Sequence, residues 1–301
     1  MPPRAIDPGS ESVQQALADF AAVAEDCGAR YLFVGGAARA LAVESGILDA
    51  RAVPEVRATT DLDFGVQFES QDAFQRFRQR LVQVFSPRED DGQIHFTHRT
   101  VSINVDVIPF GPLAQDGRLP VPGRNRDFIV LGFEEALDRA VLLKVGENLW
   151  VPVPDGPGFV LLKLIAFGDR RVPHDLQDAV QVMRNFDSAG NQARYFNEFV
   201  QEFASEQFNY DEAKYALLGL DIGRIVLPPT YVRVTGILDR LADPGNLDLA
   251  SVVEHRLVGE RLGTTEDAAR EFFLLLQGIH KGFDQECRRN SSDDNPPRAE
   301  P

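Results

Sequence analysis

The chain has 301 residues, enough for one large domain or two modest ones. Hydrophobic residues make up 44% and charged residues 26%, a composition typical of a globular chain with a substantial core. Lysines and arginines number 31 against 46 aspartates and glutamates, and the formal net charge of −15 disfavours a broad basic face that coats nucleic acid or an anionic membrane.

The number of cysteines and the hydropathy of the sequence bear on the cellular compartment in which the protein functions. Only Cys27 and Cys287 are present, which excludes a disulfide scaffold and a cysteine-based metal site. The sequence has no apolar run of about 18 residues and no secretory signal at its amino end. We therefore expect a cytoplasmic protein with no membrane partner.

The first half of the chain alternates between helical and strand-like patterns. Apolar spacing, turn residues and period-two alternation predict, in chain order, a helix over 10–26, a strand over 31–34, a helix from Ala37, a loop over 47–57, a strand over 59–68, a helix over 70–84, and two strands within 93–99 and 100–110 that pair antiparallel.

The second half becomes helical. After a Pro- and Gly-rich loop over 111–125, short strands are predicted at 128–131, 140–145 and 149–153, and then helices at 158–170, 175–185, 192–206, 210–218, 232–241 and 266–283. We therefore predict an α+β fold, a mixed sheet with helices over 1–156, followed by a helical domain over 157–287. The polar tail, 288–301, is expected to be disordered.

Asp61 and Asp63 carry the sharpest chemical signal. Residues i and i+2 of a strand point to the same face, so two carboxylates there repel each other unless a positive group lies between them. A divalent metal ion is the usual resolution, and Mg²⁺ prefers carboxylate oxygens. The alternative is a solvent-facing strand with two hydrated acids.

Asp106 favours the metal interpretation. Ser102, Asn104 and Asp106 alternate with apolar residues and so share one face of a strand. Three carboxylates on adjacent strands form a site for one or two Mg²⁺ ions, which activate an attacking hydroxyl and stabilise charge on a phosphoryl group. For Asp106 alone, an exposed strand acid is the alternative.

Gly35 and Gly36 stand between an apolar run and a helix. Glycine lets the backbone approach a ligand closely, and the amino end of the following helix suits a phosphate. A tight strand-to-helix turn is the alternative. The pair is no dinucleotide fingerprint, because the third glycine of that motif is missing.

The order of these features resembles the nucleotidyltransferase superfamily with a DNA-polymerase-β-type palm. Its glycine motif is matched by 34–36, its paired-carboxylate motif by 61–64 and its third-carboxylate motif by 105–107. The resemblance extends over residues 30–185 and implies a palm-like sheet in the first domain. The later helices match no motif of the superfamily.

The closer likeness is to the AbiEii-like toxin branch of toxin–antitoxin and abortive-infection systems. That branch often shows Arg-x-Thr-x-Asp-h-Asp, which Arg57, Thr59, Asp61 and Asp63 match. It also tends to carry a lysine on a helix, then an arginine and an Asp-x-x-Asp, as in Lys163, Arg171, Asp175 and Asp178. His174 stands where relatives commonly have lysine, and the segment from Gly36 to Asp61 is longer than usual.

The resemblance implies a magnesium-dependent enzyme that moves a nucleoside monophosphate from a nucleoside triphosphate (NTP) to a hydroxyl acceptor. Asp61 and Asp63 would hold the metal bound to the triphosphate. Asp106 would complete the metal site near the attacking hydroxyl. Gly35 and Gly36, with the helix after them, would hold the phosphates.

Further residues are implied around the triphosphate. Arg57, within the motif that includes Thr59, and Lys163 would pair with its oxygens, and Asp178 would order Lys163 or Arg171. A surface arginine is the alternative for Arg57, and a lysine that extends to the helix edge is the alternative for Lys163. For Asp175, the alternative is capping of a helix amino end.

By the same resemblance, the acceptor would be an RNA end such as that of tRNA, a protein or a small molecule, and an antitoxin partner is implied. The competing hypothesis is a catalytically inactive palm-fold module that binds a nucleotide or a protein. A phosphatase with an Asp-x-Asp nucleophile is disfavoured, because the polar run 57–60 precedes Asp61. His95 and His98 fall on opposite faces of a strand and cannot both ligate one metal ion.

Overall fold

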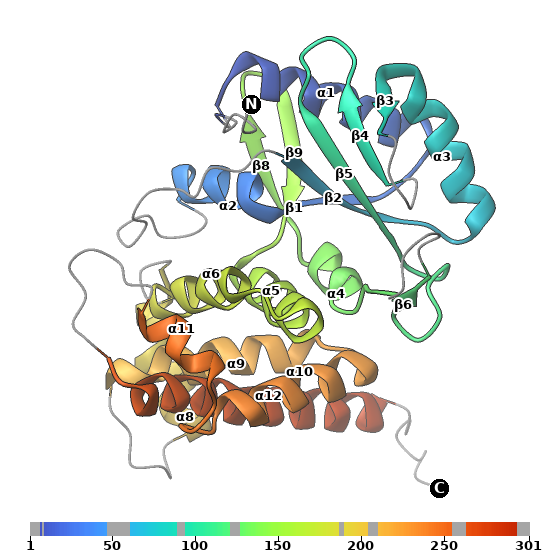
Figure 1. The fold of residues 1–301 in the computed structure, drawn as a ribbon. Helices are drawn as coiled ribbons and strands as arrows, with labels where there is room; N and C mark the ends of the chain where they lie inside the picture. The colour runs from blue at the N-terminus through green and yellow to red at the C-terminus, as the bar shows by residue number, and fades with distance from the viewer. Residues whose placement is uncertain are drawn as a thin grey trace, which may run out of the picture. The chain divides into compact units, whose positions relative to one another are not determined.

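The computed structural model describes residues 7, 9–46, 61–88, 94–120, 127–186, 190–203, 210–254 and 263–293. The chain divides into two compact units, Met1–Leu162 and Lys163–Pro301. The first unit holds the sheets and the second is helical (Figure 1). The α+β class, the mixed sheet and the helical character of the later region are therefore confirmed.

A five-stranded sheet forms the centre of the first unit, in the order β1 (Tyr31–Val34), β2 (Asp61–Gln67), β5 (Asn104–Phe110), β4 (His95–His98) and β3 (Phe85–Pro87). Strands β2 and β5 run parallel, and the other neighbours run antiparallel. The expected antiparallel pairing of the two runs within 93–110 is confirmed.

One face of this sheet is buried under two helices, α1 (Glu11–Asp26) and α3 (Gln71–Val84). The side chains of Ser10 and Ser70 cap them, as polar residues before an apolar stripe predict. The ring of Phe20 on α1 stacks on that of Phe64 on β2, with 3.7 Å between ring centroids. This apolar layer fixes which face of β2 is left for polar side chains.

The opposite face is covered in part by α4 (Phe133–Asp138), which was not predicted. A β-carbon at Gly65 would come within 2.5 Å of the ring of Phe133, so glycine at this position makes room for the helix. Helix α2 (Gly35–Glu44) begins at Gly35 and not at Ala37, because the chain turns into the helix directly after β1.

Two small hairpins complete the first unit. Strands β8 (Val141–Val145) and β9 (Leu149–Val153) pair antiparallel, close to their predicted positions. Strands β6 (Arg118–Leu119) and β7 (Phe128–Ile129) also pair, so the stretch predicted as a loop over 111–125 contains a short strand.

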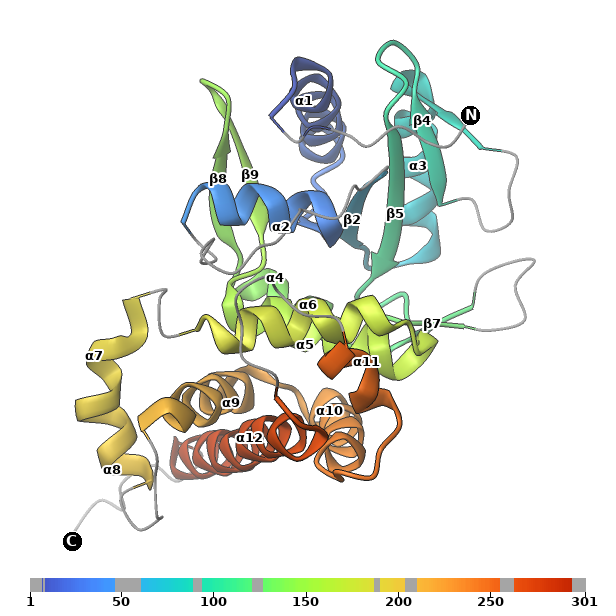
Figure 2. The same ribbon diagram turned by 60° about the vertical axis from the view of Figure 1, so that its left-hand side comes forward.

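The second unit consists of helices. Helix α5 (Gly156–Arg170) crosses into it, and the others are α6 (Pro173–Arg184), α7 (Gln192–Arg194), the π-helix η2 (Tyr195–Phe199), α8 (Val200–Phe203), the 3₁₀-helix η3 (Tyr210–Glu212), α9 (Ala213–Ile225), α10 (Pro228–Leu241), α11 (Asp248–Glu254) and α12 (Thr265–Asp293). Helices α9 and α12 lie side by side, with α10 next to α12 (Figure 2).

Two features of this unit differ from the sequence predictions. Helix α11 was not predicted, and α12 continues to Asp293, so residues 288–293 are helical where we expected a disordered tail. No glycine or proline interrupts the helical pattern there before Pro296. Residues 294–301 lie outside the described part of the chain. No helix among the described residues is long and apolar enough to span a membrane.

Candidate functional site

A row of polar residues crosses the sheet on the face away from α1 and α3. On β2, Leu62 and Phe64 are buried in the core, so Asp61 and Asp63 point to the opposite face. The register places Asp63 directly beside Asp106 on the parallel strand β5, and Asp61 beside Asn104. The structure thus brings the three predicted carboxylates onto one face of two adjacent strands.

Gly35 lies against this row. The antiparallel register of β1 and β2 pairs Val34 with Asp63, so Gly35 begins α2 beside that carboxylate. Its φ angle is +79°, which favours glycine, and a β-carbon on it would overlap the carboxylate of Asp63. Glycine is therefore required at position 35 both by its positive φ angle and by the nearby Asp63 carboxylate. Gly36 follows in the first turn of α2.

His95 extends the row on the next strand. The register of β4 and β5 pairs it with Asp106, and its Nδ1 atom lies 2.6 Å from Oδ1 of Asp106. A carboxylate only accepts hydrogen bonds, so the imidazole N–H donates. No role for His95 was predicted from the sequence. Alternation along the predicted hairpin was the signal that could have placed it on the same face as Asp106.

The carboxylates suit a hard cation in their chemistry, because Mg²⁺ takes oxygen ligands. The absent side chain of Gly35 also leaves room for the Asp63 carboxylate at the sheet edge. Asp106, however, is directed to His95, and within the described ranges no group of three or more His, Cys, Asp or Glu side chains converges as a metal site. The carboxylate oxygens are therefore of the kind that binds magnesium, but among the described residues these side chains do not converge on one point.

Lys163 and Asp178 lie together in the second unit. The Nζ atom of Lys163 on α5 lies 2.7 Å from Oδ2 of Asp178 and 3.2 Å from Oδ1 of Asp175, both on α6. Arg170 donates two hydrogen bonds of 2.6 Å to the carboxylate of Asp175. The lysine side chain is only 13% exposed, so it is held among carboxylates within the helical unit.

Asp175 is more than a helix cap. It is fully buried in the first turn of α6, where Arg170 and Lys163 surround its carboxylate. Burial by itself would raise the pKa of Asp175, but the hydrogen bonds from Arg170 and the charge of Lys163 outweigh it and hold that pKa below its usual value. Arg171 pairs instead with Asp248, at 2.8 Å.

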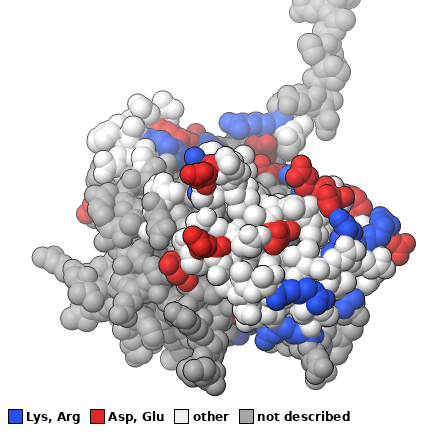
Figure 3. Space-filling model, turned by 90° about the horizontal axis from the view of Figure 1, so that it is seen from above, with Lys and Arg blue, Asp and Glu red and all other residues white. Residues whose placement is uncertain are grey.

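Two predicted residues, Arg57 and Thr59, lie outside the described residues. On the face seen in Figure 3, lysine and arginine side chains stand among acidic ones and form no continuous basic surface over the described residues.

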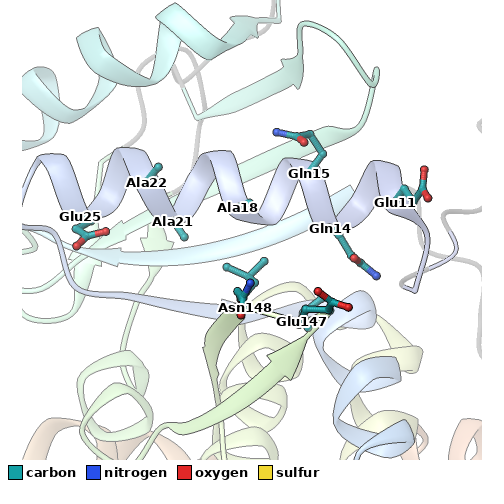
Figure 4. Close-up of a pocket in the computed structure, with 12 residues that line it drawn as sticks. Glu11, Gln14, Gln15, Ala18, Ala21, Ala22, Glu25, Glu147 and Asn148 are labelled. Atoms are coloured by element: carbon teal, nitrogen blue, oxygen red, sulfur yellow. The ribbon is translucent and has the colours of Figure 1, made fainter.

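A pocket of about 640 Å³ lies elsewhere in the first unit, between α1 and the turn from β8 to β9 (Figure 4). Its acidic lining residues are Glu11, Glu25 and Glu147, and the described residues around it include no lysine or arginine. Such a lining repels phosphates, so this pocket is not a candidate for a triphosphate site.

No family model matches the chain, and a search of the curated proteins finds no match.

Proposed function

We propose that the first unit is a magnesium-dependent nucleotidyltransferase of the palm-like type, which transfers a nucleoside monophosphate from an NTP to a hydroxyl acceptor. The observation that carries this proposal is the register of β2 and β5, which places Asp63 beside Asp106 and on the same face as Asp61. The position of Gly35 against Asp63 supports it, because a phosphate-binding turn needs close backbone approach.

Each residue has a role in the proposed reaction. Asp61, Asp63 and Asp106 would hold Mg²⁺, which when bound neutralises charge on the triphosphate. The acceptor hydroxyl attacks the α-phosphorus, the bond to the pyrophosphate oxygen breaks, and pyrophosphate leaves. The hydroxyl proton passes to a base, and Asp106 with its partner His95 is the candidate for that base.

The phosphates would be held by the turn at Gly35 and Gly36 and by the amino end of α2. Arg57 remains a candidate for the triphosphate oxygens, whereas Lys163 belongs to the second unit. In the structure Lys163 already has carboxylate partners, and Asp178 fixes its position. The acceptor is proposed to be an RNA end, a protein or a small molecule, and the likeness to AbiEii-like toxins extends the proposal to an antitoxin partner.

The test uses the purified chain, Mg²⁺, each of four α-labelled NTPs, and total RNA and lysate protein as acceptors. Asp61→Asn and Asp63→Asn remove one charge each at nearly constant shape. We expect label on one acceptor class with one preferred NTP, and loss of at least ~100-fold in both variants, as for removal of a group that stabilises charge in the transition state.

Asp127→Asn is the matched control, because Asp127 is an exposed acid outside the polar row. It should label acceptors like the unmodified chain. Equal labelling in the Asp61 and Asp63 variants would contradict the proposal.

One observation favours the second candidate, a binding module without catalysis. The three carboxylates share a face, yet no three of the described His, Cys, Asp or Glu side chains converge on one point. A module of this kind would bind an NTP, measured by equilibrium dialysis, without releasing pyrophosphate. If no NTP binds, the transferase and the nucleotide-binding form of this module both fail, and Asp61 and Asp63 are hydrated acids on a strand.

A further inference from the structure

A second pocket of the first unit lies at the other end of strand β2. Its volume is about 580 Å³, and its lining includes Gln67, the last residue of that strand, and Phe68, which follows it. Asp63 lies four residues earlier, about 13 Å along the strand at 3.3 Å per residue. The pocket is therefore separate from the carboxylate row.

Three arginines line this pocket: Arg30, which precedes β1, and Arg76 and Arg80 on α3. Two acids, Asp26 and Glu69, are also present. This local excess of positive charge contrasts with the net charge of −15 of the whole chain. The amino end of α3, with Ser70, adds a positive dipole end to the same lining.

The arginines can turn to a ligand at small cost. Arg30 pairs with Asp138 at 2.8 Å and Arg80 with Asp26 at 2.5 Å, and all four side chains are about half exposed or more. Exposed pairs of this kind contribute roughly 0–1 kcal/mol each. No hydrogen bond or ion pair engages Arg76 within the described part of the chain.

Apart from Gln67, the remaining lining consists of apolar or small residues. Ala73 and Cys27 are partly exposed there. The rings of Phe68 and Phe77, 5.3 Å apart between centroids, are only 4% and 1% exposed, so little of either ring is open to a ligand. A volume of this size is within the range that encloses a small organic molecule. The pocket thus combines three arginine side chains with a small apolar surface on which the flat ring of a ligand can pack.

We propose that this pocket binds a small phosphomonoester whose organic part carries a flat ring. A phosphate group offers three acceptor oxygens, and arginine forks match phosphate geometry, so one group can engage more than one guanidinium. The ring packs against the partly exposed side chains of Ala73 and Cys27. The acidic pocket between α1 and the β8–β9 turn lacks any such cation among its described lining residues and does not share this chemistry.

Cys27 makes the proposal directly testable. Its thiol lines the pocket, whereas the other cysteine, Cys287, is exposed on α12 in the second unit and serves as an internal reference. Alkylation of each thiol by N-ethylmaleimide is followed by peptide mass spectrometry, with phenyl phosphate as the probe. Bound phenyl phosphate should slow alkylation of Cys27 about tenfold at ten times its Kd, since only the free form reacts, and leave Cys287 unaffected.

Arg76→Gln should abolish this protection. The matched control is Arg78→Gln, which removes the same charge from the same helix outside the pocket lining and should retain it. Circular dichroism melting of each variant checks that folding is equal.

Three outcomes would overturn the proposal. They are no protection of the unmodified chain at millimolar phenyl phosphate, equal protection in Arg76→Gln, or equal protection by benzoate, which would indicate a carboxylate site. Protection by inorganic phosphate at the same concentration would remove the role of the ring. None of these outcomes depends on nucleotidyl transfer.

Discussion

The Nδ1 atom of His95 lies 2.6 Å from Oδ1 of Asp106, on two antiparallel strands whose register pairs the two residues directly. The side chains are 15% and 22% exposed, so the pair is mostly shielded from water. The imidazole occupies one oxygen of the carboxylate and fixes its orientation. Partners of this kind orient carboxylates that bind metal ions.

Replacing His95 with alanine is therefore expected to weaken metal binding at the carboxylate row. If Asp106 is a ligand, loss of its orienting partner should lower Mn²⁺ affinity by about 10–100-fold, the usual effect of removing such a group. His95→Asn should retain much of the affinity, because its amide can also donate. Electron paramagnetic resonance titration with Mn²⁺ measures the change without any need for turnover.

Thr97→Ala is the control for this variant. Thr97 lies on the same strand and face as His95, and its hydroxyl donates to Asn104 at 3.1 Å, not to a predicted ligand. Its affinity for Mn²⁺ should be unchanged. An unchanged affinity in His95→Ala would mean that Asp106 does not bind the metal through this arrangement.

Gly35→Ala tests the close approach of the turn to Asp63. A left-handed backbone costs an alanine roughly 1–2 kcal/mol, and overlap of its β-carbon with the Asp63 carboxylate should add about 1–3 kcal/mol. We expect a lower free energy of unfolding, measured in urea, together with weaker Mn²⁺ binding.

Gly46→Ala separates the two contributions. Gly46 has a φ of +74°, close to that of Gly35, and a β-carbon on it would meet no atom within 4 Å. The free energy of unfolding of this variant should fall only by the cost of the left-handed backbone, and its affinity for Mn²⁺ should be unchanged. Equal losses of stability in the two variants would show that the contact with Asp63 adds no cost.

The chain's local patterns predicted most of the elements that carry the row. Capping serines before apolar stripes located α1 and α3, and period-two alternation located β2 and β5 with Asp61, Asp63 and Asp106 on their polar faces. These signals are local, because they depend on residues within one element. They also sufficed to locate the start of the helical region.

Several contacts between side chains of different elements were missed, although the antiparallel pairing within 93–110 was predicted. The contact of His95 with Asp106 follows from the register of β4 against β5, which the sequence specifies only through burial of the opposite face. Helix α4 is short, and its place is set by the contact of Phe133 with Gly65. The carboxylate partners of Lys163 come from α6, and helical spacing alone does not show which neighbouring helix a lysine faces.

Asp175→Asn is expected to destabilise the second unit strongly. The buried carboxylate of Asp175 accepts hydrogen bonds from Arg170 and Lys163, and a hydrogen bond to a charged group contributes roughly 1.5–3 kcal/mol, so we expect a loss of about that size. Lys163 keeps Asp178 as a partner and Arg170 is 53% exposed, so neither cation is left buried and uncompensated. Because the folded state lowers the pKa of Asp175, its stabilising effect is present above the unfolded pKa of ~3.9 and is lost as pH falls through the folded value.

Urea unfolding at neutral and acidic pH, for the unmodified chain and the variant, measures this effect. The difference between the two proteins should shrink as the solution becomes more acidic than the unfolded pKa. Asp248→Asn is the control, because the Arg171–Asp248 pair is 44% and 37% exposed and should contribute less than about 1 kcal/mol. A pH-independent difference for Asp175→Asn would show that its charge is not what stabilises the fold.

Gly278→Ala tests the packing of α9 against α12. A β-carbon on Gly278 would overlap the carbonyl oxygen of Ala216, and one on Gly219 would overlap that of Leu275. The obstructing atoms are backbone and cannot rotate away, so the helices must separate. We expect a loss of about 3 kcal/mol, at the upper end of the usual cost of overpacking, measured by urea unfolding.

Gly236→Ala on α10 should act in the opposite direction. It is also a helical glycine, but a β-carbon there would meet no atom within 4 Å, so alanine should stabilise the helix by about 0.5–1 kcal/mol. Because the two substitutions should change the free energy of unfolding in opposite directions, comparing them separates the effect of helix propensity from that of the contact between the helices. If Gly278→Ala also stabilised the protein, the close approach of α9 and α12 would be wrong, because propensity alone would then account for both results.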